Sequence, residues 1–312
     1  MSAYRKIFVV ADPHRPCSAA VRRGAQLALQ CGAELTIALF EHDAAVERAA
    51  HRGAGPREAY VVARRQWLED RVAPFLDPEI KLRLEAVWAP ARRDAILAAL
   101  LTDKPDLVLK DLGHESALQR LVATPLDWEL LRSVPAALML VQPSSTRLPR
   151  RVLAAVDTGV DAAPHPLDER VLQAARRIAA CGHARVDLVH VFPHETGHGL
   201  LASHHVKLEA RDRDAFQDFA SEHVVPLERR HWVAGSPEPE IQRVARLVRA
   251  DLLVLGSTYR TALQRLSLGA TVETLLEHCT QDVLLIKPEG FAEELGRHLD
   301  LAELQRRHLA AA

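Results

Sequence analysis

The sequence predicts an α/β protein built from two tandem Rossmann-like domains, each a five-stranded parallel sheet with helices on both faces. Three observations support this fold class: an internal duplication, short apolar strands that alternate with helical segments, and a composition typical of a globular chain. Of the 312 residues, 48% are hydrophobic and 26% are charged. A chain of this length suits roughly two domains of ~150 residues each.

The duplication shows as matches at one fixed separation. The strand-like run that begins at Lys6 matches the run that begins at Arg151, which lies 145 residues later. At the same separation the pentapeptide Ala-Leu-Gln-Arg-Leu occurs identically at 117–121 and at 262–266. Because the matches keep one register, we infer two copies of a single domain.

Each copy alternates strands with helices. Strands are expected near 6–11, 34–40, 82–88, 106–110 and 137–141, and again near 151–156, 185–191, 229–233, 252–255 and 283–286. Helices are expected near 18–31, 56–73, 92–102 and 125–133, and again near 167–181, 206–222, 237–249 and 270–279. Ser18 is a plausible N-cap of the first helix and Gly32 its C-terminal stop. Strands joined through helices imply right-handed crossovers and a parallel sheet covered on both faces.

The domain boundaries follow from the duplication. The first domain is expected at 1–143, a polar linker at 144–150, the second domain at 151–288 and a helical tail at 289–312. The segment 143–150, PSSTRLPR, is short and polar and contains two prolines. Apolar residues in the tail recur at helical spacing, which predicts an amphipathic helix packed on the body of the protein.

The composition excludes several classes of function. Lys and Arg number 40 against 41 Asp and Glu, so we expect no electrostatic footprint for nucleic acid or for an anionic membrane. No apolar stretch approaches the ~20 residues of a membrane span, and the N-terminus lacks the apolar core of a signal peptide. The four cysteines form no CxxC pair. We therefore expect a cytoplasmic protein with reduced thiols.

The stretch 251–288 carries the strongest indication of a ligand site. A short apolar strand ends at Gly256, a polar loop follows, and Gly269 stands just before a helix. A strand, a glycine loop and a helix start can present backbone N–H groups to a phosphate. Ligands in such folds bind at the carboxyl ends of strands, which also places Asp157 at this edge of the sheet.

Two halves, each with an Asp after the first strand and a loop ahead of the last helix, resemble the universal stress protein family. Members of this family typically show Gly, two residues, Gly, nine residues, and then Gly followed by Ser or Thr. That loop binds ATP in the members that bind it. Gly256 and Gly269 stand at the matching separation, whereas Tyr259 replaces the middle glycine and Ala270 replaces the hydroxyl residue.

The resemblance implies one nucleotide pocket per domain. In the second domain, ATP or another nucleotide would contact Asp157, Gly256, Ser257, Arg260, Gly269 and Thr271. In the first domain Asp111 stands at the position of Gly256, and Pro125, which has no N–H, stands at that of Ala270. A carboxylate there would repel a polyphosphate, so we expect no phosphate binding by the loop 111–124 of the first domain. For the second domain the alternative is an inherited loop kept for packing alone, with Asp157 as a turn or cap residue.

The resemblance also implies how the halves associate. In the family the last strands pair across a dimer interface. A tandem chain can satisfy this pairing internally, so 137–141 and 283–286 are candidates for joining the two halves. The resemblance thus implies a monomer or a homodimer.

Histidines of the second half offer a metal-binding alternative. His194, His198 and His204 are the candidate ligands, because neutral imidazoles bind zinc and a catalytic zinc needs about three protein ligands. The segment 194–205 is expected to be a loop, however, and it lacks an HExxH motif, so solvated histidines are the other reading.

No GxSxG or Walker A motif is present, and the sequence offers no complete catalytic site. With no catalytic motif, the resemblance implies a non-enzymatic stress-response protein that binds a small ligand or a protein partner, with a degenerate nucleotide loop in the second domain only. The alternatives are an ATP-binding regulator that uses the second domain and a zinc-assisted hydrolase that uses the histidines between 190 and 205.

Overall fold

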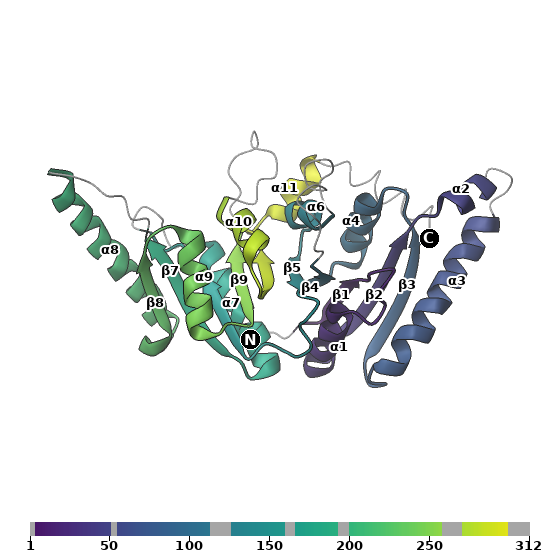
Figure 1. Cartoon of the computed structure of the whole chain (residues 1–312), viewed down its shortest axis with the longest axis horizontal. Helices are drawn as coiled ribbons and strands as arrows, with labels where there is room; N and C mark the ends of the chain where they lie inside the picture. Colours follow the sequence, from purple (N-terminus) through teal and green to yellow (C-terminus); the bar gives the residue numbers. More distant parts are fainter. Residues whose placement is uncertain are drawn as a thin grey trace. The chain divides into compact units, whose positions relative to one another are not determined.

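The structure of the chain is a computed structural model that describes residues 4–50, 55–112, 126–159, 166–192, 200–257 and 270–298. The chain divides into two compact units (Figure 1). The first unit comprises Met1–Leu148 together with Gly290–Ala312, and the second comprises Pro149–Glu289. Each unit is an α/β domain with its own parallel sheet, as the sequence predicts.

The first unit alternates strands and helices along the chain. Its elements are β1 (Lys6–Val10), α1 (Ala19–Cys31), β2 (Glu34–Glu41), α2 (Ala44–Ala50), α3 (Gly55–Val72), the 3-10 turn η1 (Ala73–Phe75), β3 (Lys81–Trp88), α4 (Arg92–Asp103), β4 (Leu107–Asp111), α6 (Leu126–Ser133) and β5 (Ala137–Val141). Helix α11 (Phe291–His298) groups with this unit. The short helix α2 was not predicted from the sequence.

The second unit repeats this order. Its elements are β6 (Arg151–Ala155), α7 (Pro166–Gly182), β7 (Arg185–Phe192), α8 (Leu200–Glu222), the 3-10 turn η2 (Leu227–Arg229), β8 (Arg230–Ala234), α9 (Pro237–Val248), β9 (Leu252–Gly256), α10 (Ala270–His278) and β10 (Asp282–Ile286). Helix α8 begins at Leu200 and not near 206. The prediction of a loop through 205 is therefore wrong for residues 200–205, which are helical. The reason is local, because leucine and alanine at 200–202 are strong helix formers.

Both sheets have the same strand order. In the first unit it is β3-β2-β1-β4-β5, and in the second it is β8-β7-β6-β9-β10, with parallel ladders between the paired strands. The order reverses between β1 and β4 and, equivalently, between β6 and β9. Because parallel crossovers are right-handed, connections that run in opposite directions place their helices on opposite faces of the sheet. Helices α1 and α3 therefore cover one face of the first sheet, and α4 and α6 cover the other.

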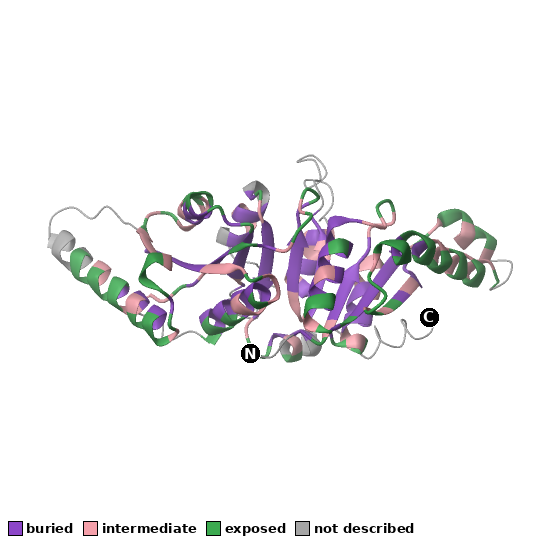
Figure 2. Ribbon diagram, turned by 90° about the horizontal axis from the view of Figure 1, so that it is seen from below, coloured by how far each residue is buried: buried purple, intermediate pink, exposed green. Residues whose placement is uncertain are grey.

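The predicted ends of the first helix are confirmed. The Ser18 side chain accepts a hydrogen bond from the Val21 N–H at 3.4 Å, and Gly32 adopts the left-handed conformation with φ of 64°. The inner strands of both sheets are buried, whereas the edge strands β3 and β8 are mostly half-buried or exposed. Helices α3 and α8 expose residues along most of their length (Figure 2). Across the part of the chain that the structure describes, no helix is long and apolar enough to cross a membrane.

Candidate functional site

Two of the predicted ligand residues lie at the carboxyl edge of the second sheet. Strands β6 and β9 are paired in parallel, with Val152 opposite Leu252, and each ends at this edge. Asp157 and Ser257 follow these strand ends, and their environments differ. Asp157 is exposed, whereas Ser257 is buried and its N–H donates to the carbonyl oxygen of Ile286 at 2.9 Å.

The remaining predicted nucleotide residues divide between described and undescribed parts of the chain. Arg260 and Gly269 lie outside the described residues. Thr271 lies in the first turn of α10, but its side chain is not among those described. The structure therefore places only Asp157, Gly256 and Ser257 in atomic detail.

Gly256 has a packing role of its own. A Cβ atom added to Gly256 would lie 2.8 Å from Cδ2 of Leu167 and 3.4 Å from Cγ2 of Val171. Both neighbours project from α7, and both are buried. Real Cβ contacts are not this short, so the glycine allows α7 to approach the end of β9 closely. The close approach accounts for a glycine at this position without a phosphate.

We expect Gly256→Ala to lower the free energy of unfolding by about 1–3 kcal/mol, the usual cost of overpacking a core. Urea denaturation followed by circular dichroism measures this change. Gly55→Ala is the matched control, because no atom lies within 4 Å of a Cβ added there. Equal stability of the two variants would contradict the packing role.

Asp168 is the most perturbed acid at this edge. It lies in the first turn of α7, and its Oδ1 accepts the N–H of Asp157 at 2.9 Å. Its Oδ2 has no hydrogen-bond partner among the described residues. Burial is the largest cause that raises the pKa of Asp168, and the negative charge of Asp157 acts in the same direction. The hydrogen bond from the Asp157 backbone and the charge of His190 oppose them, and the resulting pKa is about 7. A carboxyl group with such a pKa changes charge near neutral pH.

A buried acid–histidine pair lies beside this carboxyl group. Nε2 of His190 on β7 is 2.9 Å from Oδ1 of Asp212 on α8, and both residues are buried. The same Oδ1 accepts the indole N–H of Trp232 at 2.8 Å. The other ring nitrogen, Nδ1, lies 3.2 Å from the Val156 carbonyl oxygen and 3.4 Å from the Thr158 backbone nitrogen. Both imidazole nitrogens of His190 are therefore engaged by the protein.

This arrangement limits the chemistry of His190. A general base must offer a ring nitrogen to a substrate proton, and a metal ligand must offer one to the ion. Neither ring nitrogen of His190 is available to a substrate or an ion, so the His190–Asp212 pair stabilises the fold. His194 and His198 lie outside the described residues, and the side chain of His204 on α8 is undescribed. Within the described residues, no group of three or more potential ligands could hold a metal ion.

The first unit differs from the second at two equivalent positions. The strand ladders align Asp111 with Val141 and Gly256 with Ile286, so Asp111 takes the place of Gly256. Its Oδ1 accepts the Ala20 N–H at 3.0 Å, which puts a carboxylate at the N-terminus of α1. Leu39 of β2 lies at the sheet position that His190 occupies on β7. Among its described residues, the first unit therefore has leucine in place of the histidine of this pair.

Only partial signals for these residues are present in the sequence. Asp168 reads as an ordinary acid in a first helical turn, and its burial is a tertiary effect. Asp212 shares helical spacing with buried Phe216 and Phe219, and an acid on such an apolar stripe is a recognisable anomaly. The partner of Asp212 comes from another element, so no spacing rule could identify it.

Comparison with known proteins extends these observations. Residues 149–287 match the family described as the universal stress protein family. Universal stress protein E of Photorhabdus laumondii is 25% identical over 312 residues, covering 93% of this chain and 97% of the relative. Its counterpart in Escherichia coli K12 is 24% identical over 309 residues, covering 93% and 96%. The structure of a functionally unknown protein from Pseudomonas aeruginosa PAO1 has a TM-score of 0.74 at 24% identity, covering 97% and 98%.

Proposed function

Because the chain belongs to the universal stress protein family, we propose that it is a cytoplasmic stress-response protein that binds a small ligand or a protein partner and catalyses no reaction. Similarity to universal stress protein E extends across both units, with 93% of the chain aligned. This coverage supports a role for the tandem arrangement as a whole and not for one domain alone.

We propose that a nucleotide such as ATP binds in the second unit only. The contrast between Gly256 and Asp111 is the observation on which this rests. In the first unit the Asp111 carboxylate is buried against the Ala20 N–H, at a helix N-terminus that would otherwise favour an anion. In the second unit the equivalent residue, Gly256, has no side chain, so this position brings no carboxylate toward a polyphosphate.

The hydrogen bonds of His190 support the proposed lack of catalysis. His190 lies on β7 near the carboxyl edge of the second sheet, and protein atoms engage both of its nitrogens. Catalysis by a general base needs a nitrogen that faces a substrate. Purified protein with stoichiometric zinc and hydrolase activity would instead favour the histidine-based alternative with His194, His198 and His204.

Equilibrium dialysis with ATP tests the nucleotide proposal directly. We expect at most one ATP per chain, and we expect Gly269→Val to abolish binding because a branched side chain would fill the loop that receives the phosphates. Thr124→Val is the matched control, since Thr124 is the sequence counterpart of Gly269 in the first unit. Two ATP molecules per chain, or binding that only Thr124→Val abolishes, would refute the assignment to the second unit.

A further inference from the structure

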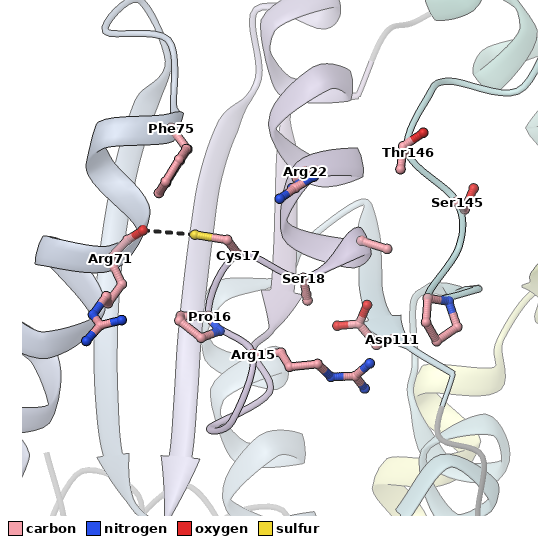
Figure 3. Close-up of a pocket in the computed structure, with 12 residues that line it drawn as sticks. Arg15, Pro16, Cys17, Ser18, Arg22, Arg71, Phe75, Asp111, Ser145 and Thr146 are labelled. Atoms are coloured by element: carbon pink, nitrogen blue, oxygen red, sulfur yellow. Dashed lines mark hydrogen bonds between the residues drawn. The ribbon is translucent and has the colours of Figure 1, made fainter.

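A cavity of about 450 Å³ lies in the first unit around the N-terminus of α1 (Figure 3). Residues 15–19 of the loop before α1 form one wall, and Arg71 and Phe75 form another. A second cavity of about 340 Å³ shares Cys17, Arg22 and Phe75 with the first and continues between α1 and η1. The first volume is within the range of about 300–1,000 Å³ that is typical of small-molecule sites.

The cavity has an excess of positive charge. Arg22 on α1 and Arg71 on α3 are both exposed, and neither forms an ion pair with any residue that the structure describes. Burial raises the pKa of the Cys17 thiol, and the charges of Arg22 and Arg71 act on the same thiol in the opposite direction. Arg22 and Arg71 thus line the same cavity as Cys17.

Arg15 adds a third cation, although it already forms an ion pair with Asp12. Its Nε lies 3.1 Å from Oδ2 of Asp12. Guanidinium groups pair in fork geometry with carboxylate and phosphate oxygens, so Arg22 and Arg71 are suited to an oxyanion.

Asp111 supplies a hydrogen-bond acceptor to the cavity. It lines the cavity and is 4% exposed, and only its Oδ1 has a partner, the Ala20 N–H. Its Oδ2 has no hydrogen-bond partner within the described ranges. A buried carboxylate oxygen without a donor costs free energy, which a ligand amino or hydroxyl group would recover.

Phe75 provides an apolar wall. Its side chain is 73% exposed, which is unusual for a phenylalanine, and it borders both cavities. An exposed ring beside two cations and a buried acceptor is a combination typical of sites for a flat organic ligand.

We propose that this cavity binds a small organic oxyanion, either a phosphate ester or a carboxylate, that also carries an amino or hydroxyl donor and a flat apolar part. Arg22 and Arg71 hold the oxyanion, Phe75 contacts the flat part, and Asp111 Oδ2 accepts the donor. The ligand is not a polyphosphate, whose several charges the Asp111 carboxylate would oppose. The site lies in the first unit and involves none of the residues proposed for the nucleotide, so the two proposals fail or succeed separately.

Cys17 gives a readout specific to the cavity. Its S–H donates to the Arg71 carbonyl oxygen at 2.9 Å, and it lines the cavity, whereas Cys31 and Cys181 line neither cavity. Full-length protein is alkylated with iodoacetamide, and peptide mass spectrometry gives the rate at each cysteine. We expect saturating O-phospho-L-tyrosine or 4-hydroxyphenylacetate to slow alkylation of Cys17 about 10-fold and to leave Cys31 and Cys181 unchanged. The first probe represents the phosphate ester and the second the carboxylate.

Arginine variants test the oxyanion contact. The double variant Arg22→Gln/Arg71→Gln removes both guanidinium groups. We expect the concentration of the protecting probe that halves the rate of Cys17 alkylation to rise about 100-fold, as loss of two charge-assisted hydrogen bonds would cause. The matched control is Arg65→Gln with Arg211→Gln, which removes two exposed guanidinium groups that line neither cavity. If the cavity variant does not fold, the oxyanion contact is tested on wild-type protein with L-tyrosine as the probe. L-Tyrosine lacks the phosphate, so we expect it to protect about 100-fold less well than O-phospho-L-tyrosine.

The donor contact has its own comparison. Phenyl phosphate lacks an amino group, so O-phospho-L-tyrosine should protect at about 10-fold lower concentration in the wild type, and this advantage should shrink in Asp111→Asn. No protection of Cys17 by either probe, equal protection of all three cysteines, or equal behaviour of cavity and control variants would overturn the proposal.

Discussion

At pH 8 the Asp168→Asn variant is expected to be more stable than the wild type by up to about 4 kcal/mol, whereas the two proteins should be equally stable near pH 4. Burial raises the pKa of Asp168 from 3.8 to about 7. Each pKa unit corresponds to about 1.4 kcal/mol, which sets the upper limit of the effect. Asparagine keeps an oxygen that can accept the Asp157 N–H, and it removes the buried charge.

The direction of the pH dependence follows from proton binding. Between about pH 4 and pH 7 folded Asp168 holds a proton that the unfolded chain releases. The contribution of Asp168 to stability is therefore fully present below the unfolded pKa, and it is lost as pH rises through the folded pKa. The difference in unfolding free energy between the variant and the wild type should grow across this window and then level off above about pH 8.

Urea denaturation at pH 4, 5, 6, 7 and 8 measures this difference. Asp214→Asn is the matched control, because Asp214 is an exposed acid of the second unit on α8. It should follow the wild type within about 0.5 kcal/mol at every pH, as surface substitutions usually do. A difference between Asp168→Asn and the wild type that stays constant with pH would show that Asp168 is ionised in the folded protein throughout.

Replacing either member of the His190–Asp212 pair is expected to cost about 3–5 kcal/mol of unfolding free energy, the usual cost of breaking a buried pair. Asp212→Leu would leave Nε2 of His190 and the Trp232 indole N–H without their shared acceptor. His190→Leu would leave the buried Asp212 carboxylate with the Trp232 indole N–H as its remaining donor among the described residues.

The double variant is expected to be more stable than the sum of the single losses by at least about 2 kcal/mol. Leucine suits the site, because Leu39 occupies the equivalent sheet position in the first unit and is fully buried. A double-mutant cycle in urea measures the coupling. The control cycle on Glu209 and Arg213 of α8, whose exposed ion pair measures 3.3 Å, should give less than about 1 kcal/mol. Additive losses at His190 and Asp212 would mean that the two side chains stabilise the fold independently.

The contrast between local and tertiary information is clearest at the carboxyl edge of the second sheet. The apolar strands, the helices between them and the fixed separation of the two copies depend on neighbours in sequence, so they were predictable. The alignment of Gly256 with Asp111 also follows from the duplication, and the strand ladders reproduce it. What each residue does there was not predictable from the alignment.

By itself, the sequence determined the tandem α/β fold, its strand order along the chain and the capping of α1 by Ser18, because periodicity and capping act within a few residues. Only the tertiary structure decided the rest. Crossover packing brings α7 against Gly256, Asp212 of α8 against His190 of β7, and Asp111 against the N-terminus of α1. Burial then decides the charge of Asp168, and burial depends on which elements meet, which no single segment of the chain encodes.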